Sequence, residues 1–290
     1  MNWKAGRPEP FPAWISTIDK AIWTMSVISL TTDFGTADSF VGVMKGVILG
    51  IAPDAALVDV THEIAPQNVR QAVYVVSNSF SFFPRGTIHL CVVDPGVGSE
   101  RRPIALEAAG HYFVGPDNGV FTEIIHRFHP GKAREIINPE MTLPVVSDTF
   151  HGRDVFAPAA AWIARGAPLS SLGPIVEKPV TIDLPSQILS APNMIEGEVI
   201  YIDRFGNAIT NLSRRMWRKV YDDVGAEGVE IQVRDQIVSD VLPCYSAAKD
   251  DEKLSAVFGS WDTLELFARN GSAEKLFGLS VGDRVEARFY

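Results

Sequence analysis

The stretch Cys91–Arg102, CVVDPGVGSERR, carries the first residues that could do chemistry. The apolar run 88–93 is typical of a buried strand, and Asp94 follows it directly. Open α/β sheets place their ligands at the carboxyl ends of parallel strands, so this carboxylate is a candidate site residue. Gly96 and Gly98 would let a ligand approach the backbone closely. Taken alone, the stretch is more typical of a surface turn with a solvated charge cluster, but the motifs further along the chain favour a site.

Three other polar groups could take part in the same chemistry. Asp33 also ends an apolar run, so two carboxylates would face one crevice if the two strands are neighbours. In the run 148–154, DTFHGRD, His151 and Arg153 are candidates for a general base, a charge stabiliser or a metal ligand, although a lone histidine is more often a core or capping residue. In 201–207, YIDRFGN, an aromatic ring beside an amide suits a planar heterocycle, and the plainer interpretation is a strand, turn and strand.

Two other kinds of site find little support in the sequence. The usable metal ligands are His62, His151, Asp94 and Asp154. None of the spacings HxH, HExxH or CxxC occurs, so we predict no metal. The phosphate-binding patterns GxGxxG and GxxxxGKS/T are absent as well, and Glu100 after the glycines would repel a phosphate.

Length and composition limit the class of protein. The chain of 290 residues is too long for one simple core and predicts one larger and one smaller domain. A formal net charge of −9 without a basic stripe argues against a nucleic-acid partner, and no apolar run is long enough to cross a bilayer. The two cysteines lie far apart, which argues against a disulfide framework and favours a reducing compartment such as the cytoplasm.

The candidate residues must be positioned by strands and helices that alternate along the first part of the chain. The order strand, helix, strand, helix, strand predicts an α/β fold with a Rossmann-like, mostly parallel sheet flanked by helices. A hairpin and two further helices are expected to follow. The expected strands are 27–31, 56–60, 87–93, 104–108 and 111–114, and the expected helices are 39–51, 69–82, 121–128 and 155–165.

The pattern changes after residue 173. Four prolines interrupt the next twenty residues, which is typical of a domain connection. Short strands separated by turns follow, as in a small antiparallel barrel or sandwich. The expected strands are 196–202, 229–233, 264–268 and 284–288. We predict an N-terminal extension (1–25, a poor signal peptide), an α/β domain (26–173), a proline-rich linker (174–192) and a β-domain (193–290).

Five motifs occur in a fixed order between Ser26 and the C-terminus: TTDFGTADSFVGVMKG, VVDPGVGSERR, PDNG, TFHGRDVFAPAAA and YIDRFGNAITNL. Together they resemble the S-adenosylmethionine hydrolases, also called hydroxide adenosyltransferases, which are relatives of the fluorinase and the chlorinase. Each motif is weak alone, whereas all five in order are highly specific. The resemblance implies an α/β domain followed by a small β-barrel domain. It also implies a homotrimer with each site between the first domain of one subunit and the second domain of its neighbour.

The resemblance implies a role for each matching residue. The aspartate and arginine of DPGVGxER fall on Asp94 and Arg101, and the histidine before GRD falls on His151; these three form the family's hydrolytic triad. Asp33 in TTDFG is expected to bind the ribose. The other substrate contacts that the resemblance implies are Asn207 and Phe205 for adenine, Asp203, Ser260 and Glu265 for the methionine part, and in addition Asp38, Trp261 and Phe267.

The resemblance also separates water from halide as the nucleophile. Halogenating members carry a tyrosine in place of Asp94, a serine in place of Gly152, and an inserted loop before the PDNG-like turn. Here the aspartate is present, the serine is absent, and 102–116 is too short for the insertion. The resemblance therefore implies hydrolysis of S-adenosylmethionine to adenosine and L-methionine, by in-line attack of an activated water on the ribose 5′ carbon, with no metal and no cofactor.

Three rival functions stay open at this point. A non-catalytic protein on the same fold would bind S-adenosylmethionine or adenosine and release no product. An adenosyl halogenase would use a halide in place of water. A metal-dependent hydrolase would use His62, His151 and Asp154 as ligands.

Overall fold

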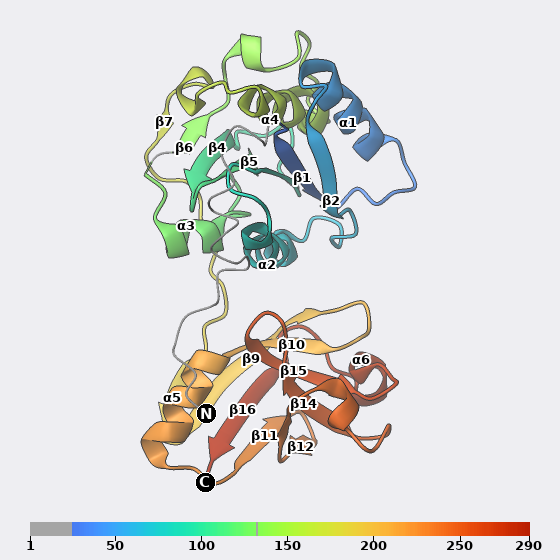
Figure 1. The fold of residues 1–290 in the computed structure, drawn as a ribbon, viewed down its shortest axis with the longest axis vertical. Helices are drawn as coiled ribbons and strands as arrows, with labels where there is room; N and C mark the ends of the chain where they lie inside the picture. Colours follow the sequence, from blue (N-terminus) through green and yellow to red (C-terminus); the bar gives the residue numbers. More distant parts are fainter. Residues whose placement is uncertain (1–24, 132) are drawn as a thin grey trace. The chain divides into compact units, whose positions relative to one another are not determined.

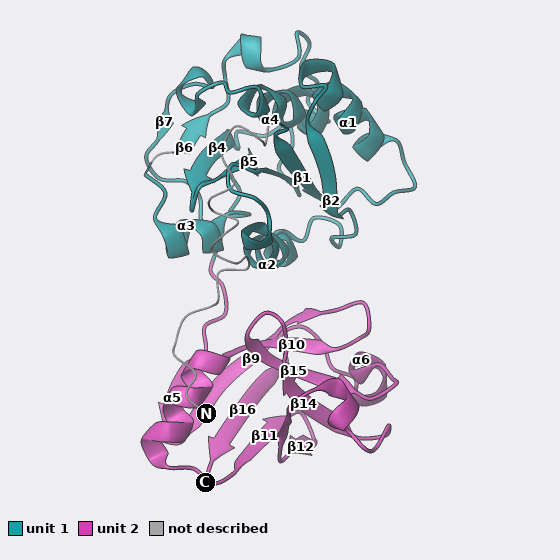
Figure 2. Cartoon of the chain, viewed as in Figure 1, with its two compact units in different colours: residues 1–182 teal, residues 183–290 magenta. Residues whose placement is uncertain are grey.

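The computed structural model describes residues 25–131 and 133–290 (Figure 1). Apart from Met25, the predicted N-terminal extension lies outside the described residues. The chain divides into two compact units after Ile182, inside the predicted linker 174–192 (Figure 2). Within the described part of the chain, every helix is too short or too polar to cross a membrane.

The first unit is built on a seven-stranded mixed sheet. Its strands are β1 (Val27–Thr32), β2 (Ala56–Thr61), β3 (Ile88–Val92), β4 (Pro103–Ala108), β5 (His111–Pro116), β6 (Ala133–Glu135) and β7 (Ile175–Val176). They lie in the order β2-β1-β3-β5-β4-β6-β7. The predicted parallel pairing is confirmed for β2, β1 and β3, and the predicted hairpin is formed by β4 and β5. Strand β5 also pairs parallel with β3, whereas β6 and β7 pair antiparallel. The strand order reverses at β1, and such a reversal is where open α/β sheets bind their ligands.

Helices cover both faces of this sheet. The helices are α1 (Phe40–Ile51), α2 (Val69–Ser79), α3 (Thr122–Phe128) and α4 (Ala157–Ala164). Helices α1 and α4 pack together on one face, and α2 and α3 pack on the other (Figure 1). Along β3, Leu90 and Val92 belong to the apolar cluster that includes residues of α1 and α4. Cys91 and Val93 belong to the cluster that includes residues of α2 and α3, so both faces of this strand are buried, as its continuous apolar run predicts.

The predicted helix 155–165 begins differently in the structure. A π-helix over Gly152–Phe156 precedes α4. Pro158 has no N–H and cannot donate to the carbonyl of Asp154, as a residue in an α-helix would. That carbonyl accepts instead from the N–H of Leu143, at 2.8 Å. The proline therefore explains the irregular turn, which directly follows His151.

The second unit is a nine-stranded sheet that nearly closes into a barrel. Its strands are β8 (Ile188–Ala191), β9 (Met194–Ile202), β10 (Ala208–Ser213), β11 (Val229–Val233), β12 (Gln236–Val238), β13 (Val241–Leu242), β14 (Leu254–Phe258), β15 (Thr263–Ala268) and β16 (Arg284–Phe289). Their order is β12-β11-β16-β9-β10-β15-β14-β13, with β8 on β9, and β12 also contacts β14. All pairs are antiparallel except β13 with β14.

Several elements of the structure were not predicted from the sequence. Helix α5 (Arg214–Val224) begins after Ser213, whose side chain accepts from a backbone N–H in the first turn, and ends at Gly225 in the left-handed conformation. It buries Trp217 and Val220. The short helix α6 (Ala273–Phe277) was also missed. Strands β7 and β8 both lie inside the predicted linker 174–192. They were not predicted because prolines are rare inside strands and usually indicate a connection.

A buried chain of polar side chains lies near the amino ends of β1, β3 and β5. The hydroxyl of Ser29 lies 2.7 Å from Nδ1 of His89, and Nε2 of His89 lies 3.2 Å from Nδ1 of His111. Burial, with repulsion from His111, lowers the pKa of His89 to about 3. Burial, with repulsion from Arg85, lowers the pKa of His111 to about 4. Both rings are therefore neutral at neutral pH, and each can donate one hydrogen bond and accept another.

Acid is expected to destabilise the protein through this histidine pair. Both pKa values lie below that of an unfolded histidine, about 6.5, so between about pH 6.5 and about pH 4 the unfolded chain binds protons that the folded chain excludes. The free energy of unfolding should fall as the pH falls through this window, and the contribution is fully present above it. His111→Gln should flatten the change in the urea midpoint between about pH 5 and about pH 7.5, whereas the exposed His126→Gln should not. An unchanged slope in His111→Gln would contradict this account.

Candidate active site

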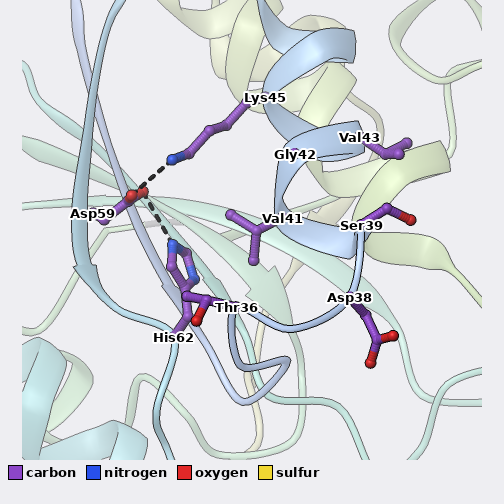
Figure 3. Close-up of a pocket in the computed structure, with 9 residues that line it drawn as sticks. All are labelled: Thr36, Asp38, Ser39, Val41, Gly42, Val43, Lys45, Asp59 and His62. Atoms are coloured by element: carbon purple, nitrogen blue, oxygen red, sulfur yellow. Dashed lines mark hydrogen bonds and ion pairs between the residues drawn. The ribbon is translucent and has the colours of Figure 1, made fainter.

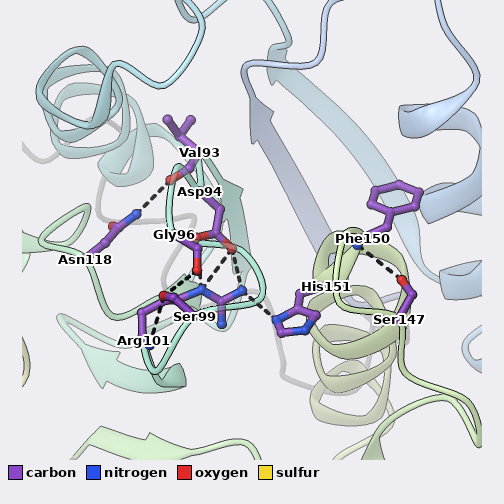
Figure 4. A network of polar contacts seen from close by, with 9 residues as sticks. All are labelled: Val93, Asp94, Gly96, Ser99, Arg101, Asn118, Ser147, Phe150 and His151. Carbon is purple, nitrogen blue, oxygen red and sulfur yellow. Dashed lines mark hydrogen bonds and ion pairs between the residues drawn. The ribbon is translucent and has the colours of Figure 1, made fainter.

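The side chains of Asp94, Arg101 and His151 come together beyond the carboxyl end of β3 (Figure 4). Nε of Arg101 lies 2.9 Å from each carboxylate oxygen of Asp94, and Nη2 lies 2.5 Å from Oδ2. The same Nη2 lies 2.6 Å from Nδ1 of His151. The guanidinium therefore joins a carboxylate to an imidazole, and the structure places the three residues of the predicted triad in one network.

The hydrogen-bond roles in this network follow from the guanidinium, which can only donate. Nδ1 of His151 must accept, so the neutral ring carries its proton on Nε2. Burial and the adjacent Arg101 lower the pKa of His151, against the opposite effect of Asp94. The imidazole is thus held neutral beside a buried ion pair.

Arg101 keeps one donor free inside this site. The Arg101 and Asp94 side chains are only 8% and 5% exposed. Nη1 of Arg101 is buried and has no hydrogen-bond partner among the described residues. Leaving such a donor unsatisfied costs about 1–3 kcal/mol, so an oxygen atom placed there would be stabilised. The ring of Phe156 lies 5.2 Å from the guanidinium and packs against it.

The loop between Asp94 and Arg101 is held by short-range contacts. The hydroxyl of Ser99 donates to the carbonyl of Gly96 and accepts from the backbone N–H of Arg101 (Figure 4). Gly98 has a φ of +76°, and a Cβ there would lie 2.5 Å from the carbonyl oxygen of Asp148. A glycine at this position lets the loop approach the segment that carries His151.

The PDNG turn, residues 116–119, contacts the chain on either side of the 94–101 loop. The side chain of Asn118 donates to the carbonyl of Val93, next to Asp94, at 2.9 Å. The buried carboxylate of Asp117 accepts from Nε of Arg102, at 2.9 Å, and from the backbone N–H of Val180, at 2.7 Å. This motif therefore holds the backbone on both sides of the 94–101 loop.

The other candidates in 148–154 are paired with each other. Asp154 is fully buried and accepts from Nε of Arg153, at 2.6 Å, and from the backbone and hydroxyl of Ser147. Although burial raises the pKa of Asp154, the hydrogen bonds from Arg153 and Ser147 outweigh burial and lower it. These contacts fix the turn before His151, so the buried Asp154 supports the site, and Arg153 is paired with it.

The proposed metal ligands do not gather. His62 is buried, with Nδ1 2.9 Å from the hydroxyl of Thr32 and Nε2 3.0 Å from Oδ1 of Asp59. Asp59 also accepts from Lys45 at 2.6 Å. Among the residues that the structure describes, no three histidine, cysteine or acidic side chains are close enough to hold a metal ion together.

The two aspartates of the first motif lie in different surroundings. Asp33 follows β1, which is in register with β3, so it shares the sheet edge that Asp94 occupies. Its Oδ2 accepts from the backbone N–H of Gln67 at 2.7 Å. Asp38 is exposed and lines a recess of about 450 Å³ with Lys45 and other residues between α1 and β2 (Figure 3). Asp33 is not among the residues that line this recess.

In the second unit, Asp203 organises the turn of the RFGN motif. Its Oδ1 accepts from the backbone N–H groups of Phe205, at 2.8 Å, and Asn207, at 2.9 Å. Its Oδ2 lies 3.1 Å from the Asn207 side-chain nitrogen. Gly206 has a φ of +83°, and a Cβ there would lie 2.0 Å from the hydroxyl of Ser272. The turn leaves the Phe205 ring 76% exposed and keeps the Asn207 amide near Asp203.

The remaining predicted residues lie on or near β15. Glu265 is 5% exposed, and Oη of Tyr245 donates to its Oε1 at 2.5 Å. Burial raises the pKa of Glu265 and Asp203 adds to this, against the effect of the Tyr245 hydrogen bond. Phe267 is only 1% exposed and packs in an apolar cluster under Tyr245. Ser260 is exposed, and the Trp261 ring packs against Tyr201.

Sequence reasoning missed Tyr245. It lies in a loop between β13 and β14 that matches none of the five motifs, so only its contact with Glu265 identifies it. Asp33, Asp38 and the triad lie in the first unit. The candidate site residues in the second unit are Asp203, Phe205, Asn207, Tyr245, Ser260, Glu265 and Phe267.

The lowered pKa of His151 gives a pH prediction for any reaction that needs the network intact. Protonation of Nδ1 removes the acceptor for Arg101, so kcat/KM should fall on the acid side, with a midpoint below about pH 6.5. The rate should not depend on this group at higher pH. His151→Gln should lower the rate and remove this acid-side fall in kcat/KM, whereas His126→Gln should preserve it. An acid-side fall in kcat/KM with its midpoint above about pH 6.5, or one that persists in His151→Gln, would contradict its assignment to His151.

Both halves of the chain match known family models. Residues 28–173 match the SAM hydroxide adenosyltransferase N-terminal domain, and residues 197–286 match the C-terminal domain of the same family. A crystal structure of an uncharacterized conserved protein from Thermotoga maritima superposes with a TM-score of 0.83 at 33% identity, covering 90% of this chain and 99% of that one.

Curated relatives agree with these matches. An (R)-S-adenosyl-L-methionine hydrolase from Thermus thermophilus is 37% identical over 267 residues, which is 89% of this chain and 98% of that protein. One from Salinispora arenicola is 43% identical over 182 residues, or 62% of this chain and 69% of that protein. A fluorinase from Actinoplanes is 28% identical over 214 residues, or 65% and 72% of the two chains. The resemblance seen in the motifs is confirmed, and the chain belongs to the SAM hydroxide adenosyltransferase family.

Proposed function

We propose that this protein hydrolyses S-adenosyl-L-methionine to adenosine and L-methionine. The relatives that carry the name of this hydrolase are 35–43% identical to the chain, and the fluorinase from Actinoplanes is 28% identical. The observation that carries the proposal is the network of Asp94, Arg101 and His151, with the buried donor Nη1 of Arg101 left free. This arrangement suits a small oxygen nucleophile.

The reaction requires the protein to orient the water and to stabilise the charge that develops on it. The sulfonium of the substrate leaves as a neutral thioether when the bond between sulfur and the 5′ carbon breaks. Water supplies the new bond from oxygen to that carbon and loses one proton. Holding the water in line with the breaking bond contributes several kcal/mol, and no metal is needed to activate such a leaving group.

In the proposed mechanism each member of the triad has one task. Arg101 stabilises the hydroxide character that develops on the water through Nη1, which has no hydrogen-bond partner in the part of the chain that the structure describes. His151 accepts from Arg101 through Nδ1, so its ring orients the guanidinium and offers only a donor on Nε2. Asp94 is then the group best placed to take the proton, directly or through another water.

The substrate contacts are part of the same proposal. Asp33, at the edge of the parallel strands, would hold the ribose hydroxyls by charge-assisted hydrogen bonds. The exposed ring of Phe205 suits stacking on adenine, and the Asn207 amide suits its edge. The residues proposed for the methionine part are Asp203, Ser260 and Glu265. The proposed contacts with the least support are Asp38, which faces a separate recess, and Phe267, which is buried in the core.

The direct test is to incubate the protein with S-adenosylmethionine and identify the products by chromatography. We expect adenosine and methionine in equal amounts. Separate reactions with fluoride or chloride are expected to give no 5′-halo-adenosine, because Asp94 and Gly152 stand where the halogenating relatives carry tyrosine and serine. Binding without any product would support the non-catalytic rival instead, and halo-adenosine formed as fast as adenosine would support the halogenase.

Three further points belong to this proposal. The order β2-β1-β3, with helices on both faces, supports a Rossmann-like description of the first unit. A homotrimer is proposed from the family resemblance, and light scattering would test it. The two free cysteines support a reducing compartment such as the cytoplasm.

A further inference from the structure

A pair of acidic side chains in the second unit lacks a cationic partner. Glu265 is buried on β15, and Asp203 lies close enough to raise the pKa of its carboxyl. No lysine or arginine in 25–131 and 133–290 lies within ion-pair distance of either carboxylate. Two neighbouring carboxylates repel each other when both are ionised, and a cation placed between them relieves that repulsion. The pair is therefore suited to an ammonium group.

The Glu265 carboxylate is fixed in one orientation. Its Oε1 accepts from Oη of Tyr245, at 2.5 Å. Its Oε2 lies over Gly259, where an added Cβ would come within 2.2 Å of that oxygen. A carboxylate has about four acceptor positions, so with the Tyr245 hydroxyl and the Asn207 side chain bonded to it Glu265 can still accept from a ligand.

Tyr245 is itself anchored to β15. Its ring meets Phe267 edge-on, with ring centroids 4.9 Å apart. The short turn that carries it is held by Nη1 of Arg269, which donates to the carbonyl of Ala248 at 2.8 Å. Glu265 and Phe267 lie two residues apart on one strand and face the same side, so one side chain positions the Tyr245 ring while the other receives its hydroxyl.

The hydroxyl also favours the charged form of Glu265. Burial and Asp203 both raise the pKa of this carboxyl, and the hydrogen bonds with Tyr245 and, to a lesser extent, Asn207 oppose them. Burial raises the pKa of Tyr245 as well, so its hydroxyl remains a donor at neutral pH. Loss of this donor would leave Glu265 both less ionised and less well oriented.

We propose that Tyr245 is a positioning residue that sets specificity for the amino-acid part of the substrate, by orienting Glu265 toward the substrate ammonium. This inference rests on the proposed function, since it takes S-adenosylmethionine as the ligand. Tyr245 touches neither the reacting carbon nor the water in this account. Its effect should therefore appear in substrate binding and not in the chemical step.

The test compares two substrates in Tyr245→Phe, which removes one oxygen and keeps the ring that packs on Phe267. One is S-adenosylmethionine, and the other is the adenosyl dimethylsulfonium, which keeps the sulfonium and lacks the amino-acid part. We expect KM for S-adenosylmethionine to rise roughly tenfold with kcat nearly unchanged, and the dimethylsulfonium to be affected less than about twofold. Tyr221→Phe, in the same unit, is the matched control and should change neither.

A double-mutant cycle identifies the partner. In a Glu265→Gln background, Tyr245→Phe should raise KM by less than about twofold. Equal losses on both substrates, or no loss on S-adenosylmethionine, would overturn the inference. If the wild-type protein releases no adenosine, the proposed function fails, and the Kd values for S-adenosylmethionine and adenosine then test the inference separately. Tyr245→Phe should raise the first roughly tenfold and leave the second unchanged, and equal changes in both would refute it.

Discussion

Arg101→Lys is expected to lower kcat about 10²- to 10³-fold, although the positive charge is kept. A lysine carries one compact ammonium group and cannot match the forked guanidinium, which contacts Asp94 and His151 and still offers Nη1. Because the lost donor acts on charge that develops during the reaction, kcat should fall much more than substrate affinity.

The measurement is steady-state turnover of S-adenosylmethionine, with the Kd for adenosine measured on the same preparation. Arg70→Lys, at an exposed position on α2, is the matched control and should keep wild-type kcat. A kcat for Arg101→Lys within about threefold of the wild type would remove Arg101 from the mechanism, because a lost charge-stabilising donor costs far more.

Asp94→Asn is expected to have two large effects. The amide keeps the size of the side chain and removes its charge, so the buried guanidinium of Arg101 loses its counter-ion. Breaking a buried pair in this way destabilises a protein by about 3–5 kcal/mol. Turnover should also fall by about 10³-fold or more, because the same change removes the proposed proton acceptor.

Urea unfolding and single-turnover rates separate the two effects. Asp223→Asn is the control, because the Asp223 side chain is 64% exposed and its contact with Lys219 is a surface ion pair. Such pairs contribute at most about 1 kcal/mol, so this variant should unfold nearly as the wild type does. If Asp94→Asn were as stable and as active as Asp223→Asn, the network would not be the catalytic centre, and its ion pair would not stabilise the fold.

Much of the first unit could be predicted from the sequence because its elements follow simple periods. The run before Asp94 is apolar at every position except His89, as in a strand buried on both faces, and β3 is such a strand. The helix after Gly152 was placed less well, because its first turn depends on where the carbonyl freed by Pro158 finds a donor. That donor, Leu143, belongs to a loop whose path no local pattern reveals.

The elements of the second unit were harder to predict from the sequence. Helix α5 has a capping serine, a terminal glycine and an apolar face, but it was missed within a region expected to hold only strands. Strands β7 and β8 fall among prolines, which usually mark a connection. Strand β7 depends on β6, which is far away in sequence, whereas β8 forms a hairpin with the neighbouring β9. Both are short, and their own residues give little sign of them.

In the candidate site, too, the sequence identified some features and only the structure showed others. The motifs identified Asp94, Arg101 and His151, and the structure places them in one network. The motifs could not show that Arg153 and Asp154 pair with each other, or that Arg101 keeps a buried donor free. Such facts depend on the packing of distant segments, since Gly98 and Asp148 must meet before His151 can reach Arg101.

The origin of the new oxygen atom tests the central claim most directly. A single turnover of S-adenosylmethionine in water enriched in oxygen-18, followed by mass spectrometry of the products, shows which bond was made. We expect one heavy oxygen in adenosine, at the 5′ position, and none in methionine. Unlabelled adenosine, or the absence of adenosine while the substrate is consumed, would contradict the attack of water on the 5′ carbon.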